Sequence, residues 1–207
     1  MLKKHQLPTV ADFRLDIDLD QLRHETTKLA EQFVDVKTAN PMLCANHVKL
    51  VGQVYDNFEQ INLTTPSETL DHTASIKERL RRKEEHLYNV PTPEYTDSYF
   101  QKIITQLQAP ASRIRITKLA AGKTIPFHVD YDVSYAVRCI CPIFSDDNVI
   151  NLFKRDGKVE AHVLKPGRAY FLNIAYQHAV VNMSDKPRVA LMFSLTNHDD
   201  LTAHIAS

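Results

Sequence analysis

Two residues of chemical interest stand close together in the segment Thr124-Ile-Pro-Phe-His-Val-Asp130. If this segment is an extended strand, His128 and Asp130 point to the same face, because side chains alternate with a period of two. An imidazole and a carboxylate on one face can ligate a single metal ion. A third ligand is expected from a distant strand, and His178, followed by Ala179-Val-Val181, stands in such a run.

Two imidazoles and one carboxylate leave positions on the metal open, which is the ligand set of non-haem Fe(II) oxygenases. Zinc uses the same ligand types, so other residues must distinguish the two metals. Each histidine alone would fit a satisfied core position, and Asp130 alone would fit a turn. The ligand interpretation therefore depends on the joint context of His128, Asp130 and His178.

Arg188 opens the otherwise apolar run Val189-Ala-Leu-Met-Phe193. A buried guanidinium is costly without an anion, and its planar fork suits a carboxylate, which an oxo-acid co-substrate would supply. A surface pair with Asp185 is the alternative. Arg138 lies in an uncharged run, where it would hold a substrate carboxylate, help to bind the co-substrate, or form a structural ion pair. Ser134 is a weaker candidate for a hydrogen bond to the co-substrate.

Strand-like runs separated by turn residues dominate the chain from residue 111 onward, at a spacing of roughly ten residues. These runs cover residues 113–119, 124–130, 134–144, 148–154, 158–164, 168–174, 177–182 and 187–195. So many short strands predict a mainly β fold, a double-stranded β-helix of the jelly-roll or cupin-like kind, or a closed barrel. Such a fold would bring His178 back beside His128.

Helical periodicity is typical of the first part of the chain instead. Candidate helices cover residues 18–33, 74–87 and 96–107, the last with Thr96 or Asp97 as its N-cap, while residues 40–66 fit short strands or a loop-rich segment. A helix that buries one face must pack on another element. We therefore predict one compact domain, in which a helical N-terminal region, 1–110, packs outside a β-helix catalytic core, 111–207.

Residues 111–207 resemble the aspartyl/asparaginyl β-hydroxylase-like branch of the Fe(II)/2-oxoglutarate dioxygenases, which also includes free-proline hydroxylases. The matching strings are His128-x-Asp130, Arg138-Cys-Ile-Cys-Pro-Ile143, Pro166-Gly167 before Arg168-Ala-Tyr-Phe-Leu-Asn173, and His178-Ala-Val-Val-Asn-Met-Ser-Asp-Lys-Pro-Arg188. The last string is similar to the family's distal histidine, asparagine and co-substrate arginine in order and spacing. One departure is Ile140, which stands where many relatives have a second histidine.

The resemblance implies an enzyme that hydroxylates an unactivated C–H bond while 2-oxoglutarate and O2 are converted to succinate and CO2. Fe(II) would be held by His128, Asp130 and His178, 2-oxoglutarate by Arg188, and the substrate by Arg138. Peptide hydroxylases of the family lack a carboxylate at the place of Asp130, which favours a small carboxylate such as a free amino acid as substrate. A peptide side chain is the second choice, and a cupin-like metal-binding or sensory barrel without turnover stays open.

Bulk composition offers no general attraction to a charged partner, because 25 basic residues balance 25 acidic ones. The charged run 77–85 lacks interleaved aromatic residues and is typical of a solvated helix face, so nucleic acid is not expected as a partner. No apolar stretch is long enough to cross a bilayer. We expect a cytoplasmic protein with free cysteines, of which Cys139 and Cys141 fit small core positions; the oligomeric state stays open.

Overall fold

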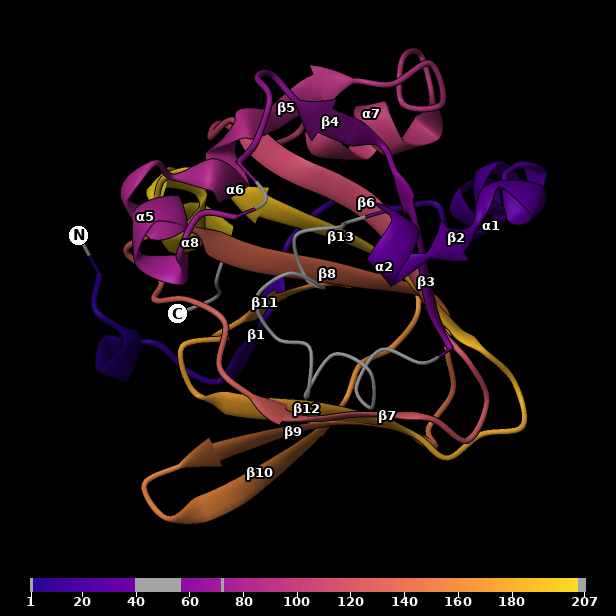
Figure 1. The fold of residues 1–207 in the computed structure, drawn as a ribbon. Helices are drawn as coiled ribbons and strands as arrows, with labels where there is room; N and C mark the ends of the chain where they lie inside the picture. Colours follow the sequence, from indigo (N-terminus) through magenta and orange to yellow (C-terminus); the bar gives the residue numbers. More distant parts are fainter. Residues whose placement is uncertain (1, 40–56, 72, 205–207) are drawn as a thin grey trace.

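Thirteen strands, six α-helices and two 3₁₀ helices form the part of the chain that the computed structural model describes, residues 2–39, 57–71 and 73–204 (Figure 1). The strands are β1 (Val10–Phe13), β2 (Val34–Asp35), β3 (Phe58–Asn62), β4 (Thr64–Pro66), β5 (Tyr88–Pro91), β6 (Ala111–Leu119), β7 (Thr124–His128), β8 (Val137–Phe144), β9 (Val149–Arg155), β10 (Lys158–Val163), β11 (Ala169–Leu172), β12 (Gln177–Asn182) and β13 (Arg188–Leu195). The helices are η1 (Lys4–Gln6), α1 (Leu19–Lys28), η2 (Ala30–Gln32), α2 (Val36–Ala39), α5 (Ile76–Arg81), α6 (Glu84–Leu87), α7 (Tyr99–Ile104) and α8 (Asp199–His204).

Two antiparallel sheets face each other across the molecule. The large sheet has the order β1-β11-β8-β13-β6-β3-β2, and the small sheet has the order β10-β9-β12-β7. From β6 to β13 the chain passes repeatedly from one sheet to the other, and β9 and β10 form the one hairpin within a sheet along this path. This is the jelly-roll pattern, and the predicted mainly β fold is confirmed.

Period-two alternation in β8 and β13 explains how the core is built. Val137, Cys139, Cys141 and Ile143 point to the outer face of the large sheet and belong to the main hydrophobic cluster, together with side chains of α1 and α7. Arg138 and Ile140 point to the inner face, toward the small sheet. Both cysteines are free and buried, as predicted for small core residues.

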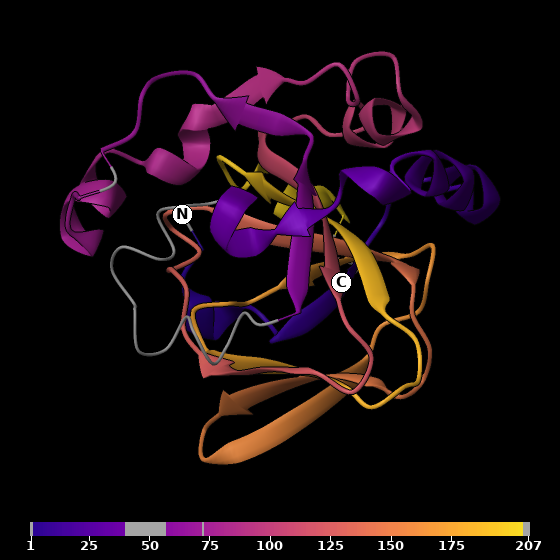
Figure 2. The ribbon, with the colours of Figure 1, turned by 45° about the vertical axis from the view of Figure 1, so that its right-hand side comes forward.

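Helices cover the large sheet on the side away from β9 and β10. Figure 2, a turned view, shows α7, β4 and β5 on that side, as Figure 1 does. The apolar face of α7 supplies Phe100, Ile103 and Ile104 to the core, and Ser98 caps its first turn by accepting from the N–H of Gln101. A helix was predicted here, but its N-cap is Ser98 and not Thr96 or Asp97.

The N-terminal region differs from the predicted helical layer in two respects. Strands β1, β2 and β3 join the large sheet, and strands this short carry too few residues for their periodicity to be recognised. The expected helix 74–87 is divided into α5 and α6 at Lys83, which has a left-handed backbone with φ of 52°. Residues 40–66 were expected to form short strands or a loop-rich segment; the part from residue 57 contains the short strands β3 and β4, and residues 40–56 lie outside the described residues.

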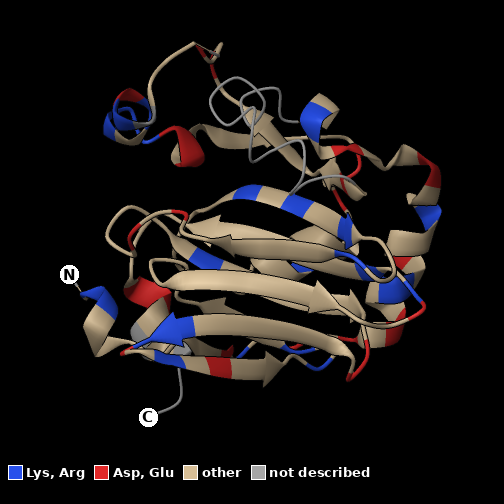
Figure 3. Ribbon diagram, turned by 60° about the horizontal axis from the view of Figure 1, so that its bottom comes forward, with Lys and Arg blue, Asp and Glu red and all other residues tan. Residues whose placement is uncertain are grey.

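Charged residues of both signs are spread over the molecule, in line with the equal numbers of acidic and basic side chains (Figure 3). Among the residues described, no helix combines the length and apolar character that a membrane span requires.

Candidate active site

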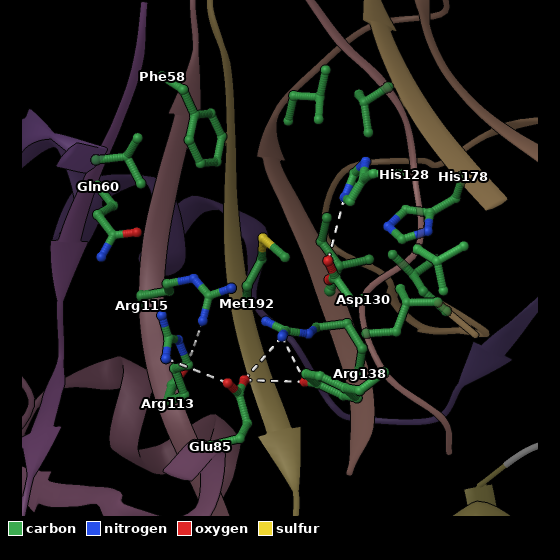
Figure 4. Close-up of a pocket in the computed structure, with 18 of the residues that line it drawn as sticks. Phe58, Gln60, Glu85, Arg113, Arg115, His128, Asp130, Arg138, His178 and Met192 are labelled. Atoms are coloured by element: carbon green, nitrogen blue, oxygen red, sulfur yellow. Dashed lines mark hydrogen bonds and ion pairs between the residues drawn. The ribbon is translucent and has the colours of Figure 1, made fainter. Parts of the chain in front are cut away.

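A cavity of about 340 Å³ lies between the two sheets. The small sheet contributes His128 and His178 to its wall, while the large sheet contributes Arg115 and Arg138, and helix α6 closes one end with Glu85 (Figure 4). This volume falls within the range of small-molecule sites. The jelly roll therefore surrounds a partly polar interior, and the main apolar core lies outside it.

His128, Asp130 and His178 come together on the small-sheet side of this cavity. His128 and His178 are register partners in β7 and β12, and their ring centroids are 4.2 Å apart. Asp130 follows β7, and its Oδ1 lies 3.4 Å from Nε2 of His128. One possible ligand atom from each of the three residues lies within 4.8 Å of the other two, a spacing that a single metal ion can bridge.

Backbone carbonyls determine which nitrogen of each histidine is free. Nδ1 of His128 lies 2.8 Å from the carbonyl oxygen of Pro126, and Nδ1 of His178 lies 3.1 Å from that of Tyr176. A carbonyl oxygen only accepts, so each Nδ1 carries the proton and each Nε2 keeps a lone pair for a metal. Burial lowers the pKa of His178, which also favours the neutral ligand form. The donor set of two imidazoles and a carboxylate fits Fe(II).

Arg188 is buried at the start of β13 and borders the same cavity. Its Nη1 donates to Oγ1 of Thr117 over 3.0 Å, and among the described residues no carboxylate lies within ion-pair distance of it. Burial lowers the pKa of Arg188 to about 10. The alternative surface pair with Asp185 is not formed, because Asp185 is exposed and Arg188 is not. The described residues therefore leave this cation without a counter-ion, and a bound anion would stabilise it.

Arg138 is buried and uses only part of its guanidinium within the protein. Its Nη2 donates to Oε1 of Glu85 over 2.9 Å and to the hydroxyl of Tyr131 over 2.6 Å. Its Nε and Nη1 are buried without a hydrogen-bond partner among the described residues. The sequence left an ion pair and a ligand anchor open as roles for Arg138. Its Nη2 forms the ion pair, while its Nε and Nη1 are available to a ligand.

Ser134 is the predicted site residue that the structure does not bring to the cavity. It is exposed in the turn before β8, where its N–H donates to Oδ1 of Asp132 over 2.9 Å, and it borders a separate depression beside residues 2–5. The prediction assumed a strand from residue 134, but β8 begins at Val137. The alternation that suggested an inward serine therefore does not apply there.

Glu85 is a site residue that the sequence reasoning missed. Its Oε1 accepts from Arg138, Tyr131 and Ser194, over 2.9, 3.0 and 2.8 Å, and its Oε2 lies 3.4 Å from Nη1 of Arg113. Burial by itself would raise the pKa of Glu85, but the surrounding arginines lower it to about 2. The charged run 77–85 was predicted to be a solvated helix face, and this prediction is wrong for Glu85, its last residue.

Arg113, Arg115 and Thr117 are the other inward residues that were missed. They alternate along β6 with Ile114 and Ile116, which face the main hydrophobic cluster. This alternation was visible in the sequence, since a strand with isoleucines on one face and two arginines and a threonine on the other predicts a polar interior.

Comparisons with known proteins agree with this arrangement. The model of the aspartyl/asparaginyl beta-hydroxylase family matches residues 72–198, more than half of the chain. A prolyl-4-hydroxylase from Pseudomonas putida has a similar structure, with a TM-score of 0.50 and 11% sequence identity over 91% of this chain and 92% of that one. An oxidoreductase of the 2OG-Fe(II) oxygenase family from Burkholderia pseudomallei aligns with a TM-score of 0.41 and 13% identity over 68% of each chain.

At 11% identity the likeness to the prolyl-4-hydroxylase shows a shared fold and nothing more, and no curated protein matches the chain. The family match does not depend on that structural likeness, and it spans α5, α6 and all the strands from β5 to β13. The predicted enzyme class, a dioxygenase, is confirmed with it. The chain belongs to the aspartyl/asparaginyl beta-hydroxylase family.

Proposed function

We propose that this protein is an Fe(II)- and 2-oxoglutarate-dependent hydroxylase that acts on a C–H bond of a small carboxylate, such as a free amino acid. The observation that carries the proposal is Arg188, a buried cation with no carboxylate partner among the described residues, in the same cavity as His128, Asp130 and His178. A metal-storage site would need the three ligands but would have no use for this arginine. A co-substrate that binds the metal and carries a carboxylate at its far end would explain both the three metal ligands and the buried arginine.

Different residues of the cavity would bind the metal and the co-substrate. Bound Fe(II) would supply the oxidation chemistry, in which O2 and 2-oxoglutarate are consumed, succinate and CO2 are released, and a hydroxyl group enters the substrate. His128, Asp130 and His178 hold the metal through their free lone pairs. Arg188, oriented by Thr117, would bind the far carboxylate of the oxo acid.

Apolar side chains complete the cavity around these polar groups. Ile140, Leu172, Ile174 and Met192 line the wall near the metal ligands. An apolar wall limits the water that reaches the metal and so protects the reaction from side products. The substrate bond to be oxidised would lie against this wall, held by groups further from the metal.

Two unpaired polar groups support an amino acid as the substrate. Nε and Nη1 of Arg138 are available to a carboxylate, and Oε1 of Glu84 is a buried acceptor without a partner in the described part of the chain. Both residues line the cavity. A molecule that carries an acid and an amino group would satisfy both, and leaving them unpaired would cost free energy.

Anaerobic titration of the protein with Fe(II) and 2-oxoglutarate tests the proposal. We expect a metal-to-ligand charge-transfer band in the visible spectrum. The variant Arg188→Ala should bind 2-oxoglutarate about 10- to 100-fold more weakly, because it loses a charged hydrogen-bonded pair. The control Arg168→Ala removes an exposed arginine that pairs with Asp12, and it should bind like the wild type.

Absence of the band, with tight retention of Zn(II), would overturn the proposal in favour of a non-catalytic metal-binding barrel. Unchanged binding of 2-oxoglutarate by Arg188→Ala would show that this arginine has another role. Succinate release during a screen of amino acids then identifies the substrate.

A further inference from the structure

Three arginines surround a single carboxylate at the end of the cavity that α6 closes. Arg113 and Arg138 pair with Glu85, at 3.4 and 2.9 Å. Arg115 forms no ion pair with any described residue, and its one hydrogen bond is a 3.4 Å contact from Nη1 to the backbone carbonyl of Arg113. Counted over the described residues, this end of the cavity therefore has two more positive charges than negative ones.

Figure 4 shows how Arg115 and Arg138 lie relative to each other. Their guanidinium groups point toward the same part of the cavity from the two sides of β13, the strand that carries Met192, although like charges repel. Burial, together with Arg138 and Arg113, lowers the pKa of Arg115 to about 9. The Nη1 of Arg138 has no hydrogen-bond partner among the described residues. A negative group within reach of both guanidinium groups would offset their repulsion.

The opposite half of the cavity cannot supply the missing negative charge. Fe(II) carries two positive charges and Arg188 one, and these are cancelled by Asp130 and by the two carboxylates of 2-oxoglutarate. Arg79 and Glu84, the other charged residues in the described lining, pair with each other at 2.9 Å. Once metal and co-substrate are bound, the surplus of two positive charges around Glu85 remains.

We infer that the substrate carries two acidic groups, and that Arg115 and Arg138 bind one of them between their guanidinium groups. This inference rests on the proposed function and narrows it, because a substrate with one acid group would offset only one of the two surplus positive charges. The site should therefore distinguish an acid from its amide, although the two have nearly the same shape. The amide would be rejected because it leaves the charge of the two arginines without a negative partner.

Binding measurements on matched acid and amide pairs test the inference. The probes are L-aspartate and L-asparagine, L-glutamate and L-glutamine, and succinate and succinamate, titrated calorimetrically into anaerobic protein saturated with Fe(II) and 2-oxoglutarate. In at least one pair the acid should bind about 10- to 100-fold more tightly than the amide, as expected for one charged hydrogen-bonded contact. Equal affinities in every pair, or no binding by any acid, would overturn the inference.

The variant Arg115→Gln separates recognition from structure. It should reduce the affinity for the preferred acid to that for the amide, and it should leave the charge-transfer band and the affinity for 2-oxoglutarate unchanged. Its melting temperature should not fall, because the substitution removes a repelling charge. Arg115→Lys should restore part of the preference, and Arg168→Gln is the matched control at an exposed arginine.

Two outcomes keep this inference distinct from the proposed function. If the band forms but Arg115→Gln keeps the full preference for the acid, the arginine site is wrong and the oxygenase proposal stands. If the wild type gives no band, the failure belongs to the proposed function.

Discussion

Replacement of Glu85 by Gln is the most informative single change in this molecule. The carboxylate is buried and is the counter-ion of Arg113 and Arg138, with Arg115 close enough to lower its pKa further. A glutamine keeps the size of the side chain and one acceptor oxygen, but it removes the charge. Three guanidinium groups would then lie together without an anion, a situation that strongly destabilises the folded state.

The pKa of Glu85 gives the magnitude and the direction of the effect. The folded pKa, about 2, lies below the ordinary value of 4.5. A difference of this size corresponds to about 3 kcal/mol of folding free energy. Because the folded pKa is the lower one, this stabilisation is complete above pH 4.5 and is lost as the pH falls from 4.5 toward 2.

Urea unfolding of the wild type and Glu85→Gln across this pH range measures the effect. At pH 7 the variant should be less stable by about 3 kcal/mol, and the difference should shrink toward zero as Glu85 becomes protonated in the wild type. Asp147→Asn is the control, since its carboxylate pairs with Lys165 on the surface and is 76% exposed. A difference below about 1 kcal/mol at pH 7, or one that does not change with pH, would refute the reasoning.

Two further predictions concern the scaffold. Gly167 and Gly157 both have φ of +75°, but a Cβ at Gly167 would lie 3.1 Å from Cβ of Leu19, whereas nothing lies within 4 Å at Gly157. Gly157→Ala should cost about 1 kcal/mol in unfolding free energy, and Gly167→Ala measurably more; equal losses would exclude the contact with α1 as the cause. Burial raises the pKa of Cys139 and, to about 12, that of Cys141, so a thiol reagent at pH 8 should label neither until the protein is unfolded, as peptide mapping would show.

The sequence was informative about the jelly roll because strands 111–195 carry a repeated physical signal. Each run alternates or is β-branched, and each is bounded by turn residues such as Asp156-Gly157 and Pro166-Gly167, whose glycines do have positive φ. Strand β1 has four residues and pairs only with β11, so its place in the sheet depends on long-range pairing that no local pattern encodes.

The site could be predicted only as far as side chains on regular strands were concerned. His128, Arg138, His178 and Arg188 all lie within or at the start of strands, where period two determines the face that a side chain joins. The burial of Glu85, by contrast, could not be predicted from strand alternation. Its position in a charged run made exposure the expected outcome, and only the packing of α6 against the end of β6 buries it.

Burial of Glu85 and the surplus of cations around it have the same origin. The inner face of β6 is turned toward the small sheet, so Arg113 and Arg115 are largely withdrawn from solvent and the fold itself creates a need for anions. Among the described residues, Glu85 meets that need for Arg113 and Arg138, and none meets it for Arg115 or for Arg188. Two separate unpaired cations in one cavity fit an enzyme that must bind two different acids together, a co-substrate at one end and a substrate at the other.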